Sequence, residues 1–396
     1  MNRNVLLLVG GIALAGSIPA SAEDVKMGVL LGFTGPAESI APNMALAAEL
    51  AFKEASDSGI FLNGSKIVSV RGDDTCEDAG AATAAAERLV NSERVVGIMG
   101  PTCSGITVAI TKNVTGTIGV PMISPSATSP AITDLDDGGY TFRDVPSDAR
   151  QGQILADLVL ERGIKTVAIS YVNDDYGKGL STSFAAAYTA KGGKVTLNAA
   201  HEDGRGDYSA EVGALSASGA DVLVVFGRFD QGGAAIIQTS LDTGAFKKFV
   251  LADGMISQVL IDKIGAGLEG SFGTQPGSSS DASKKFVELA KAAGFDGDGG
   301  FRPESYDAAA ILVLATQAAG STDRKAVTDN IRKVANAPGE KIYPGELAKA
   351  LKILKEGGKI NYEGATGVEF DDKGEVPGAY RVEEVKNGKF EVIGVR

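Results

Sequence analysis

The chain has 396 residues, a formal net charge of −12 at pH 7, two cysteines and one histidine. Its length exceeds one ordinary domain, so we expect two lobes, and its acidic balance argues against nucleic acid and anionic membrane surfaces as partners. Two cysteines and one histidine do not make a usual zinc site, so we expect neither a metal nor another cofactor.

The first 22 residues have the pattern of a secretory signal peptide. Arg3 gives a positive start, residues 5–15 form a short apolar run, and residues 17–22 are mostly small. We predict export to the periplasm, with cleavage after Ala22 and a mature chain that begins at Glu23. A membrane anchor is the alternative interpretation, but the apolar run is too short to span the hydrocarbon of a bilayer.

Export would place Cys76 and Cys103 in an oxidising compartment. A disulfide between them is the natural pairing, and two buried free thiols are the alternative. Closing a loop of this size contributes about 3.5 kcal/mol to stability on the chain-entropy estimate.

From residue 25 onward, short β-branched runs alternate with longer amphipathic segments, which predicts βαβ units and a parallel sheet with right-handed crossovers. The first series has strands at 25–31, 67–71 and 95–99 and helices at 43–56 and 79–91. A second series has helices at 151–162, 176–191, 209–218 and 233–244 and strands at 166–171, 194–200, 221–226 and 248–252. These strands are too many to extend the first sheet, so we expect a second α/β lobe.

After residue 270 the chain is expected to leave the second lobe. It does so through residues 272–276, and helices are predicted at 282–293, 305–320, 325–335 and 346–355. Residues 367–374 and 380–395 are typical of hairpin strands around Asn387-Gly388. The proposed hinge segments are 143–147, 272–276 and 363–368.

Two neighbouring strands end in small polar residues. The apolar run at 95–99 is followed by Gly, Pro, Thr, Cys and Ser at 100–105, and the run at 120–123 by Ser, Pro, Ala and Thr at 124–130. Ligands bind at the carboxyl ends of strands in an open parallel sheet. Residues 99–130 therefore predict a ligand seat with free hydroxyl and backbone groups.

Two other motifs do not predict a site. Residues 265–270 match G-x-G-x-x-G, but they follow a helix and precede a strand, the reverse of what dinucleotide binding needs. Residues 296–300 read Asp-Gly-Asp-Gly-Gly, as in a calcium loop, but the sixth position is Phe301 instead of glycine. We interpret residues 296–300 as a flexible surface turn.

Six further motifs occur in the order of one known family: FTGP at 33–36, DDTC at 73–76, GPTCS at 100–104, MISPSATSP at 122–130, NDDYGKGL at 173–180 and FDDKG at 370–374. In them the chain resembles the periplasmic branched-chain amino-acid binding proteins, the solute receptors of ABC importers. The resemblance implies an α/β fold of two Rossmann-like lobes joined by a three-crossover hinge, the type I periplasmic binding fold. It implies a first lobe at 23–143 and 274–365 and a second lobe at 144–273 and 366–396.

The resemblance also implies an amino-acid site in the cleft between the lobes. The carboxylate-binding positions fall on Ser104 and Thr128, at expected helix N-termini, with Ser126 in the same loop. The ammonium group is expected against the carbonyl of Ala127 and the carboxylate of Asp253.

Tyr176 is expected to cover the solute from the second lobe. Each of these positions has a purely structural alternative. Thr128 or Ser129 caps the turn that begins at Pro130, Asp253 is a turn residue before glycine, and Tyr176 packs at the start of a helix.

Two departures from the family pattern bear on the substrate. Ile40 stands where an aromatic residue usually walls the side-chain pocket, and Arg228-Phe229 stands where an aromatic pair is usual. If Arg228 points into the cleft, it favours a polar or acidic group or pairs with Asp253. If it points out, Phe229 lines the cleft and an aliphatic solute is favoured.

We expect a monomeric periplasmic receptor that binds a branched-chain or related small amino acid and delivers it to the membrane subunits of an ABC permease. The alternatives are the same clamp with an amide, a urea-like compound or an aromatic or organic acid, and the ligand-sensing domain of a receptor. An enzyme is not expected. A hydrolase is least favoured, because the chain has one histidine and no nucleophile motif.

Overall fold

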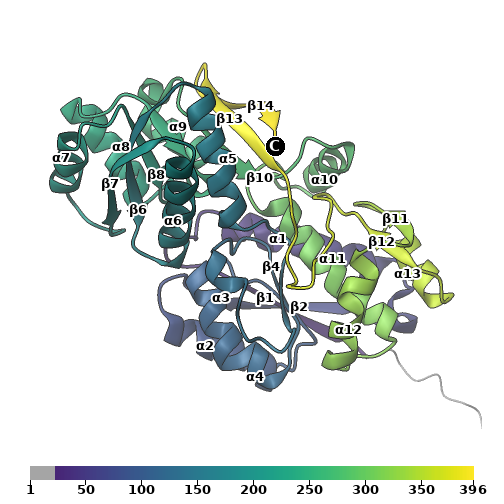
Figure 1. Ribbon diagram of the computed structural model, residues 1–396. Helices are drawn as coiled ribbons and strands as arrows, with labels where there is room; N and C mark the ends of the chain where they lie inside the picture. The colour runs from purple at the N-terminus through teal and green to yellow at the C-terminus, as the bar shows by residue number, and fades with distance from the viewer. Residues whose placement is uncertain (1–22) are drawn as a thin grey trace, which may run out of the picture.

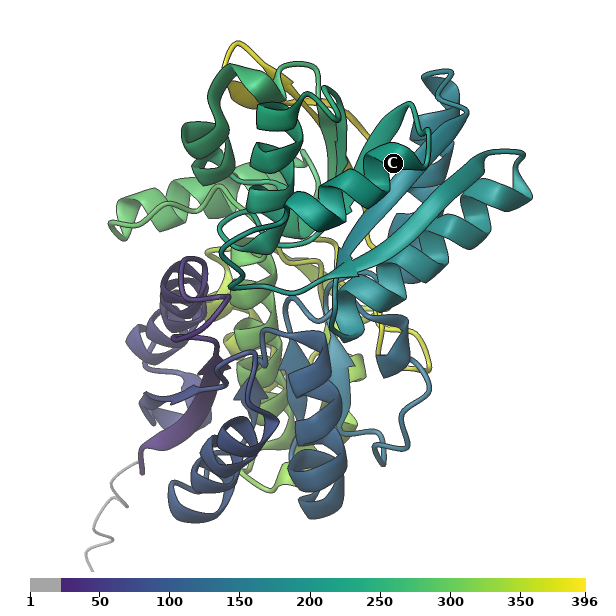
Figure 2. The same ribbon diagram turned by 90° about the vertical axis from the view of Figure 1, so that its left-hand side faces the viewer.

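The computed structural model describes residues 23–396, so the predicted signal peptide and its cleavage after Ala22 lie outside the described residues. The chain folds into two lobes with one large sheet each, and Figures 1 and 2 show the lobes side by side with several chain segments passing between them. No helix within residues 23–396 is both long and apolar enough to cross a membrane.

The first lobe is built on a parallel sheet with the strand order β2-β1-β3-β4-β5. Its strands are β1 (Val25–Leu31), β2 (Ile67–Asp73), β3 (Ile98–Met99), β4 (Met122–Ser124) and β5 (Thr141–Arg143). Both faces of β1 are buried, because Val29 and Leu31 pack in one core and Leu30 packs in another. This explains the nearly unbroken apolar sequence of the strand.

Helices cover both faces of the first sheet. One face carries α1 (Ala41–Asp57), α10 (Asp281–Ala292), α11 (Arg302–Ala319), α12 (Arg324–Ala335) and α13 (Leu347–Lys355). The other carries α2 (Ala79–Glu87) and α3 (Ser104–Ile110), and α3 continues through a π-helical turn into α4 (Gly116–Ile118). In α1, the buried Met44, Ala48 and Phe52 recur every four residues, which is the stripe that a helix needs to pack on a sheet.

The second lobe has a larger mixed sheet in the order β14-β13-β10-β9-β8-β6-β7. The strands are β6 (Thr166–Val172), β7 (Lys194–His201), β8 (Val222–Phe226), β9 (Phe249–Leu251), β10 (Phe272–Pro276), β13 (Tyr380–Lys386) and β14 (Lys389–Val395). Helices α5 (Asp148–Glu161) and α6 (Asp175–Ala190) cover one face, and α7 (Ser209–Ala217), α8 (Gly232–Thr243) and α9 (Gln258–Ile264) cover the other. The predicted β13–β14 hairpin is confirmed.

Several sequence predictions need correction. Residues 272–276 are strand β10 inside the second sheet, not a free hinge segment. Residues 367–374 form no strand, and Val368 and Phe370 pack instead in the core of the first lobe. A small parallel sheet of β11 (Glu340–Ile342) and β12 (Ile360–Tyr362) was not predicted.

These contacts bear on where the lobes begin and end. Pro276 pairs with Tyr380 of β13, whereas Val376 packs in the core of the first lobe. We therefore propose that the second crossing follows Pro276 rather than Gly273, and that the third follows Val376 rather than Ala365.

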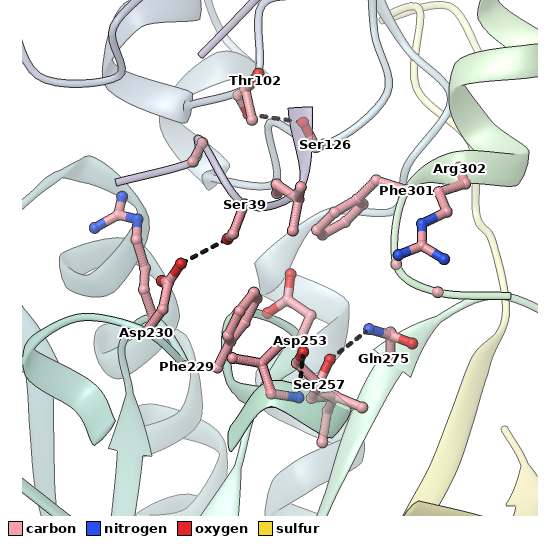
Figure 3. Close-up of a pocket in the computed structure, with 18 of the residues that line it drawn as sticks. Ser39, Thr102, Ser126, Phe229, Asp230, Asp253, Ser257, Gln275, Phe301 and Arg302 are labelled. Atoms are coloured by element: carbon pink, nitrogen blue, oxygen red, sulfur yellow. Dashed lines mark hydrogen bonds between the residues drawn. The ribbon is translucent and has the colours of Figure 1, made fainter. Parts of the chain in front are cut away.

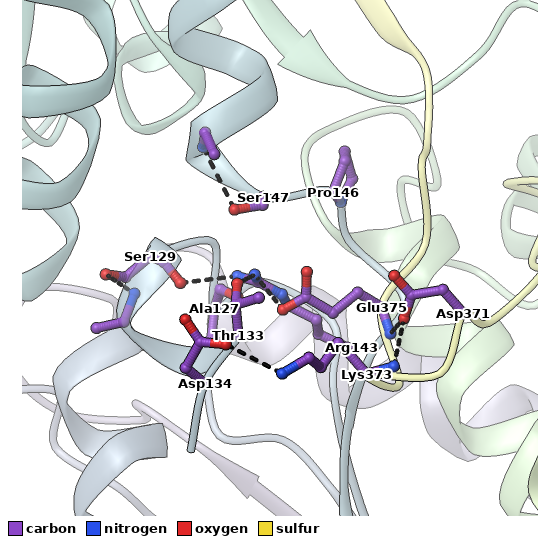
Figure 4. Close-up of polar contacts among 12 residues, drawn as sticks. Ala127, Ser129, Thr133, Asp134, Arg143, Pro146, Ser147, Asp371, Lys373 and Glu375 are labelled. Atoms are coloured by element: carbon purple, nitrogen blue, oxygen red, sulfur yellow. Dashed lines mark hydrogen bonds and ion pairs between the residues drawn. The ribbon is translucent and has the colours of Figure 1, made fainter. Parts of the chain in front are cut away.

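A buried arginine joins the crossings to the ligand seat (Figure 4). Arg143, at the first crossing, is 1% exposed and forms an ion pair with Glu375, which precedes the third crossing. Its Nη1 donates hydrogen bonds to the carbonyl oxygens of Ala127 (3.2 Å) and Ser129 (2.9 Å). One guanidinium thus ties two crossing segments to the loop after β4.

Glu375→Gln should lower the free energy of unfolding by about 3 kcal/mol, because the buried guanidinium loses its counter-charge. Asp134→Asn is the matched control, since the nearby Asp134–Lys373 pair is exposed to solvent and should contribute less than about 1 kcal/mol. Urea unfolding followed by circular dichroism measures both changes. Equal effects of the two substitutions would contradict this role of Arg143.

Three buried carboxyl groups cluster behind the first crossing. Asp144, Glu304 and Asp307 are each 2% exposed or less. Burial raises the pKa of Glu304 to about 8 and that of Asp307 to about 6, and burial with repulsion from Asp307 raises the pKa of Asp144. The folded protein therefore keeps a proton on Glu304 at pH values where the unfolded chain has lost it. Its contribution to stability decreases as pH rises from about 4.5 toward 8.

Glu304→Gln should flatten this pH dependence, because glutamine resembles the protonated acid at every pH. Between pH 5.5 and 7.5 the free energy of unfolding of the wild type should fall more steeply than that of the variant, by about 1.4 kcal/mol per pH unit. Urea titrations at several pH values measure the two slopes. Parallel slopes would show that Glu304 does not hold a proton in the folded state.

Candidate functional site

A cavity of about 300 Å³ lies between the lobes and is lined by residues of both. Figure 3 shows Thr102 and Ser126 on one side and Phe229 and Asp253 facing them across the space. The walls come from the loops that follow β1, β3 and β4 in the first lobe and β8 and β9 in the second. The cavity therefore lies at the carboxyl ends of strands from both sheets, as the sequence predicted for the first.

Three features hold the loop after β3 in place: close packing at Gly100, hydrogen bonds to Asp74, and a disulfide at Cys103. Gly100 has a φ of +119°, and a Cβ there would lie 1.9 Å from the carbonyl oxygen of Leu30, so the close approach requires glycine. The buried carboxylate of Asp74 accepts hydrogen bonds from the backbone N–H groups of Thr102 (2.7 Å) and Cys76 (3.0 Å). Burial raises the pKa of Asp74 to about 7.

The disulfide between Cys76 and Cys103 is confirmed and adds a covalent tie to the same loop. Cys103 is the residue before α3, and its neighbour Ser104 opens the helix. Both residues line the cavity. The disulfide therefore fixes the position at which α3 begins beside the cavity.

Two of the predicted seat residues, Ser104 and Ser126, line the cavity. The Ser104 Oγ accepts a hydrogen bond from the Ser129 N–H (3.1 Å), and the Ser126 Oγ donates one to the carbonyl oxygen of Thr102 (2.8 Å). The Ser104 hydroxyl can therefore still donate its O–H, whereas the Ser126 hydroxyl can only accept a further hydrogen bond.

Ala127 and Thr128 are buried but are not among the residues that line the cavity. The Ala127 carbonyl accepts from Arg143, so part of its capacity is already used. Ser129, not Thr128, caps the short turn at Pro130, because its side chain accepts from the Ala131 N–H. The buried Thr128 hydroxyl has no hydrogen-bond partner among the described residues.

Asp253 and Tyr176 form the opposite wall. Asp253 follows β9, is 3% exposed, and accepts a hydrogen bond from the Tyr176 hydroxyl at 2.7 Å. A Cβ on Gly254 would lie 3.0 Å from that hydroxyl, so glycine leaves room for the contact. Burial raises the pKa of Asp253, and no Lys or Arg side chain within residues 23–396 pairs with it.

Arg228 does not pair with Asp253. Its guanidinium instead forms ion pairs with Asp174 and Asp203, the latter at 2.9 Å, although the residue contributes to the cavity wall. Burial alone would lower the pKa of Arg228, but the two carboxylates outweigh burial and raise it. The charge of Arg228 is therefore neutralised within the second lobe, and Phe229 and Ile40 line the cavity beside it.

One wall of the cavity was not predicted from the sequence. Residues 296–302, which connect α10 to α11, extend into the cleft and place Phe301 against it, and Gln275 of β10 lies opposite (Figure 3). Phe301 has a φ of +67°, which is uncommon for a bulky residue. The aspartate-glycine turn of residues 296–300 was the only sequence signal for this wall, and it pointed to a turn rather than to a ligand.

Two hydrogen bonds close the cleft across the lobes. The Ser39 hydroxyl donates to the Asp230 carboxylate at 2.5 Å, and the Ser129 hydroxyl donates to the carbonyl oxygen of Asp175 at 3.0 Å. The structure is thus a closed clamp. One part of its cavity carries hydroxyl groups and a buried carboxylate, and Ile40, Phe229, Ile256 and Phe301 supply apolar wall.

Comparison with known proteins places these features in one family. A family model described as "Periplasmic binding protein" matches residues 24–352. The Leu/Ile/Val-binding protein homolog 1 of Brucella melitensis biotype 1 is 30% identical over 404 residues, which cover 98% of each chain.

Solved structures have the same fold. The leucine binding protein LivK of Thermotoga maritima MSB8 is 26% identical, with a TM-score of 0.76 and coverage of 94% of this chain and 98% of the other. An ABC-transporter solute binding protein of R. palustris in complex with benzoate is 19% identical, with a TM-score of 0.76 and coverage of 94% and 96%.

Replacing both Cys76 and Cys103 with serine should lower the free energy of unfolding by about 3.5 kcal/mol, the chain-entropy value for a loop of this length. Because the disulfide holds the loop before Ser104, solute affinity should fall as well. Urea unfolding of the oxidised wild type, the reduced wild type and the double variant tests the first effect. If all three were equally stable, the disulfide would have no structural role.

Proposed function

The chain belongs to the periplasmic binding protein family, and from this premise we propose that it binds an α-amino acid in the cleft and delivers it to an ABC permease. The observation that carries the proposal is Asp253, a buried carboxylate in the cavity wall without a cationic partner among the described residues. Such a group is costly unless the solute brings a positive charge. An α-ammonium group supplies that charge.

The opposite wall suits the carboxylate of the same solute. Ser104 and Ser126 line it; the Ser104 hydroxyl, at the start of α3, can still donate its O–H, whereas the Ser126 O–H already donates to the Thr102 carbonyl oxygen. Hydroxyl and helix N-terminal donors stabilise an anion in a site with little water. We propose that Thr128 and the Ala127 carbonyl join these contacts when the solute is bound, although neither lines the closed cavity.

The apolar wall favours a neutral side chain on the solute. Ile40, Phe229, Ile256 and Phe301 supply this wall, and the charges of Arg228 and Arg302 are already paired with aspartates. An acidic side chain would therefore find no free cation among the described lining residues. The name of the Brucella relative supports a branched-chain solute such as leucine, isoleucine or valine.

An aromatic or organic acid is the second candidate, because a relative with this fold is solved in complex with benzoate. Benzoate has a carboxylate but no ammonium group, so its ring would leave the Asp253 carboxylate unpaired. The geometry of this cleft therefore favours a zwitterion over a simple acid.

We further propose that the protein acts as a periplasmic monomer after cleavage at Ala22, and that it binds without catalysis. Its closed form has contacts between the lobes, so a solute that touches both walls shifts the population toward closure. The permease would then meet the closed, loaded form.

Asp253→Asn should lower amino-acid affinity about 100-fold or more, because the ammonium group loses its counter-charge in a buried site. Asp230→Asn is the matched control: Asp230 also lines the cleft, but its contact is with the Ser39 hydroxyl, and asparagine can still accept that hydrogen bond. Isothermal titration calorimetry with L-leucine measures both affinities.

A thermal-shift screen of the twenty amino acids, benzoate, urea and simple amides identifies the solute class. We expect only compounds with an α-ammonium group to raise the melting temperature. A shift caused by benzoate or urea alone would overturn the amino-acid proposal.

A further inference from the structure

Besides the two hydrogen bonds that cross the cleft, an ion pair joins the lobes. The Nη1 of Arg381, on β13 of the second lobe, lies 3.3 Å from the Oδ1 of Asp298. Asp298 belongs to residues 296–302, called the wall segment below, whose Phe301 packs in the core of the first lobe. The wall segment lines the cavity, whereas Arg381 does not. Arg381 therefore contacts this wall from outside the cavity.

The same guanidinium holds a wall residue of its own lobe. Its Nη2 donates to the Oε1 of Gln275, its cross-strand partner on β10, at 2.6 Å. Gln275 is 3% exposed, and its Nε2 donates to the carbonyl oxygen of Ile256 at 3.3 Å. Gln275 and Ile256 both line the cavity. Arg381 thus connects the walls that the two lobes contribute at this end of the cavity.

The wall segment comes closest to the second lobe at Gly300. A Cβ there would lie 2.7 Å from the Nε2 of Gln275 and 3.4 Å from its Cδ. Apart from the chain neighbours, no other heavy atom within residues 23–396 would lie within 4 Å of it. The φ of Gly300 is not positive, so its backbone suits alanine as well. Glycine at this position therefore serves the approach of the two lobes rather than the fold of the first.

The other charges at this contact are paired within one lobe. Arg381 also forms an ion pair with Glu383, two residues further along β13, at 3.1 Å. In the wall segment, Arg302 pairs with Asp296 at 2.6 Å. These two pairs need no partner from the opposite lobe. The pair between Arg381 and Asp298, by contrast, requires the wall segment to meet the second lobe.

We propose that Arg381 is a positioning residue that holds the wall segment against the second lobe in the closed form and thereby slows release of the solute. A contact that exists only in the closed form shifts the population toward that form. The solute leaves through opening, so the dissociation rate falls, whereas association begins from the open form and changes little. This inference rests on the proposed function, since it requires a solute in the cleft, but it does not depend on an ammonium group.

Arg381→Gln should raise the dissociation rate constant about fivefold, the upper range for a solvent-exposed ion pair, and change the association rate constant less than about twofold. Stopped-flow fluorescence with L-leucine, or with the amino acid of largest thermal shift, measures both constants. The chain has no tryptophan, so Tyr176 in the cavity wall is the reporter. Arg162→Gln is the matched control: Arg162 pairs with Glu384 of the same strand within the second lobe, and both rate constants should stay unchanged.

Two further variants separate the contact between the lobes from a general loss of stability. Asp298→Asn should raise the dissociation rate constant about threefold in the wild type and not at all in Arg381→Gln, where its partner is already absent. Gly300→Ala should also raise it, because the added methyl group meets only Gln275. The free energy of unfolding of Gly300→Ala without solute should not fall, as urea unfolding can show.

Each other outcome gives a decision. An equal effect of Asp298→Asn with and without Arg381, or an effect of Arg381→Gln on association alone, overturns this inference and leaves the proposed function standing. If Arg381→Gln does not fold, Gly300→Ala decides, and an unchanged dissociation rate overturns the inference. If no amino acid binds to the wild type, the proposed function fails and this inference fails with it.

Discussion

The interactions of the Arg143 guanidinium connect the ligand seat to the segments that cross between the lobes. It lies at the first crossing, pairs with Glu375 near the third, and donates to the Ala127 and Ser129 carbonyl oxygens in the ligand seat. A buried cation tolerates few arrangements, because every lost partner leaves an uncompensated charge. The seat and two of the crossings therefore keep a fixed relation to one another, and opening of the lobes must take place around this cluster.

In the cleft, by contrast, a buried carboxyl group has no cationic partner among the described residues. Asp253 in the wall is a buried carboxyl group, and Arg228 is neutralised by Asp174 and Asp203. A buried carboxylate without a cationic partner is costly, and the proposed ammonium group of the solute would offset this cost. The proposed preference for a zwitterion follows from this missing cation.

Local sequence signals pointed to the parts of the cavity wall that the two loops after β3 and β4 supply. The small polar residues after β3 and β4, and the cysteine beside Ser104, are visible as short motifs, and they occupy the predicted seat. Phe301 and Gln275 gave no such signal, because they reach the cavity from the segment before α11 and from β10, far from the seat in sequence. Their role depends on which surfaces meet when the lobes close.

The sequence by itself determined two α/β lobes and the family, because strand and helix periodicity and ordered motifs are local properties of the chain. It also supplied the two cysteines that pair. The tertiary structure decided the direction of Arg228, the strand identity of residues 272–276, and the wall formed by residues 296–302. It alone showed that Asp253 is buried without a cationic partner among the described residues, because burial and charge pairing depend on contacts between distant segments that no local pattern encodes.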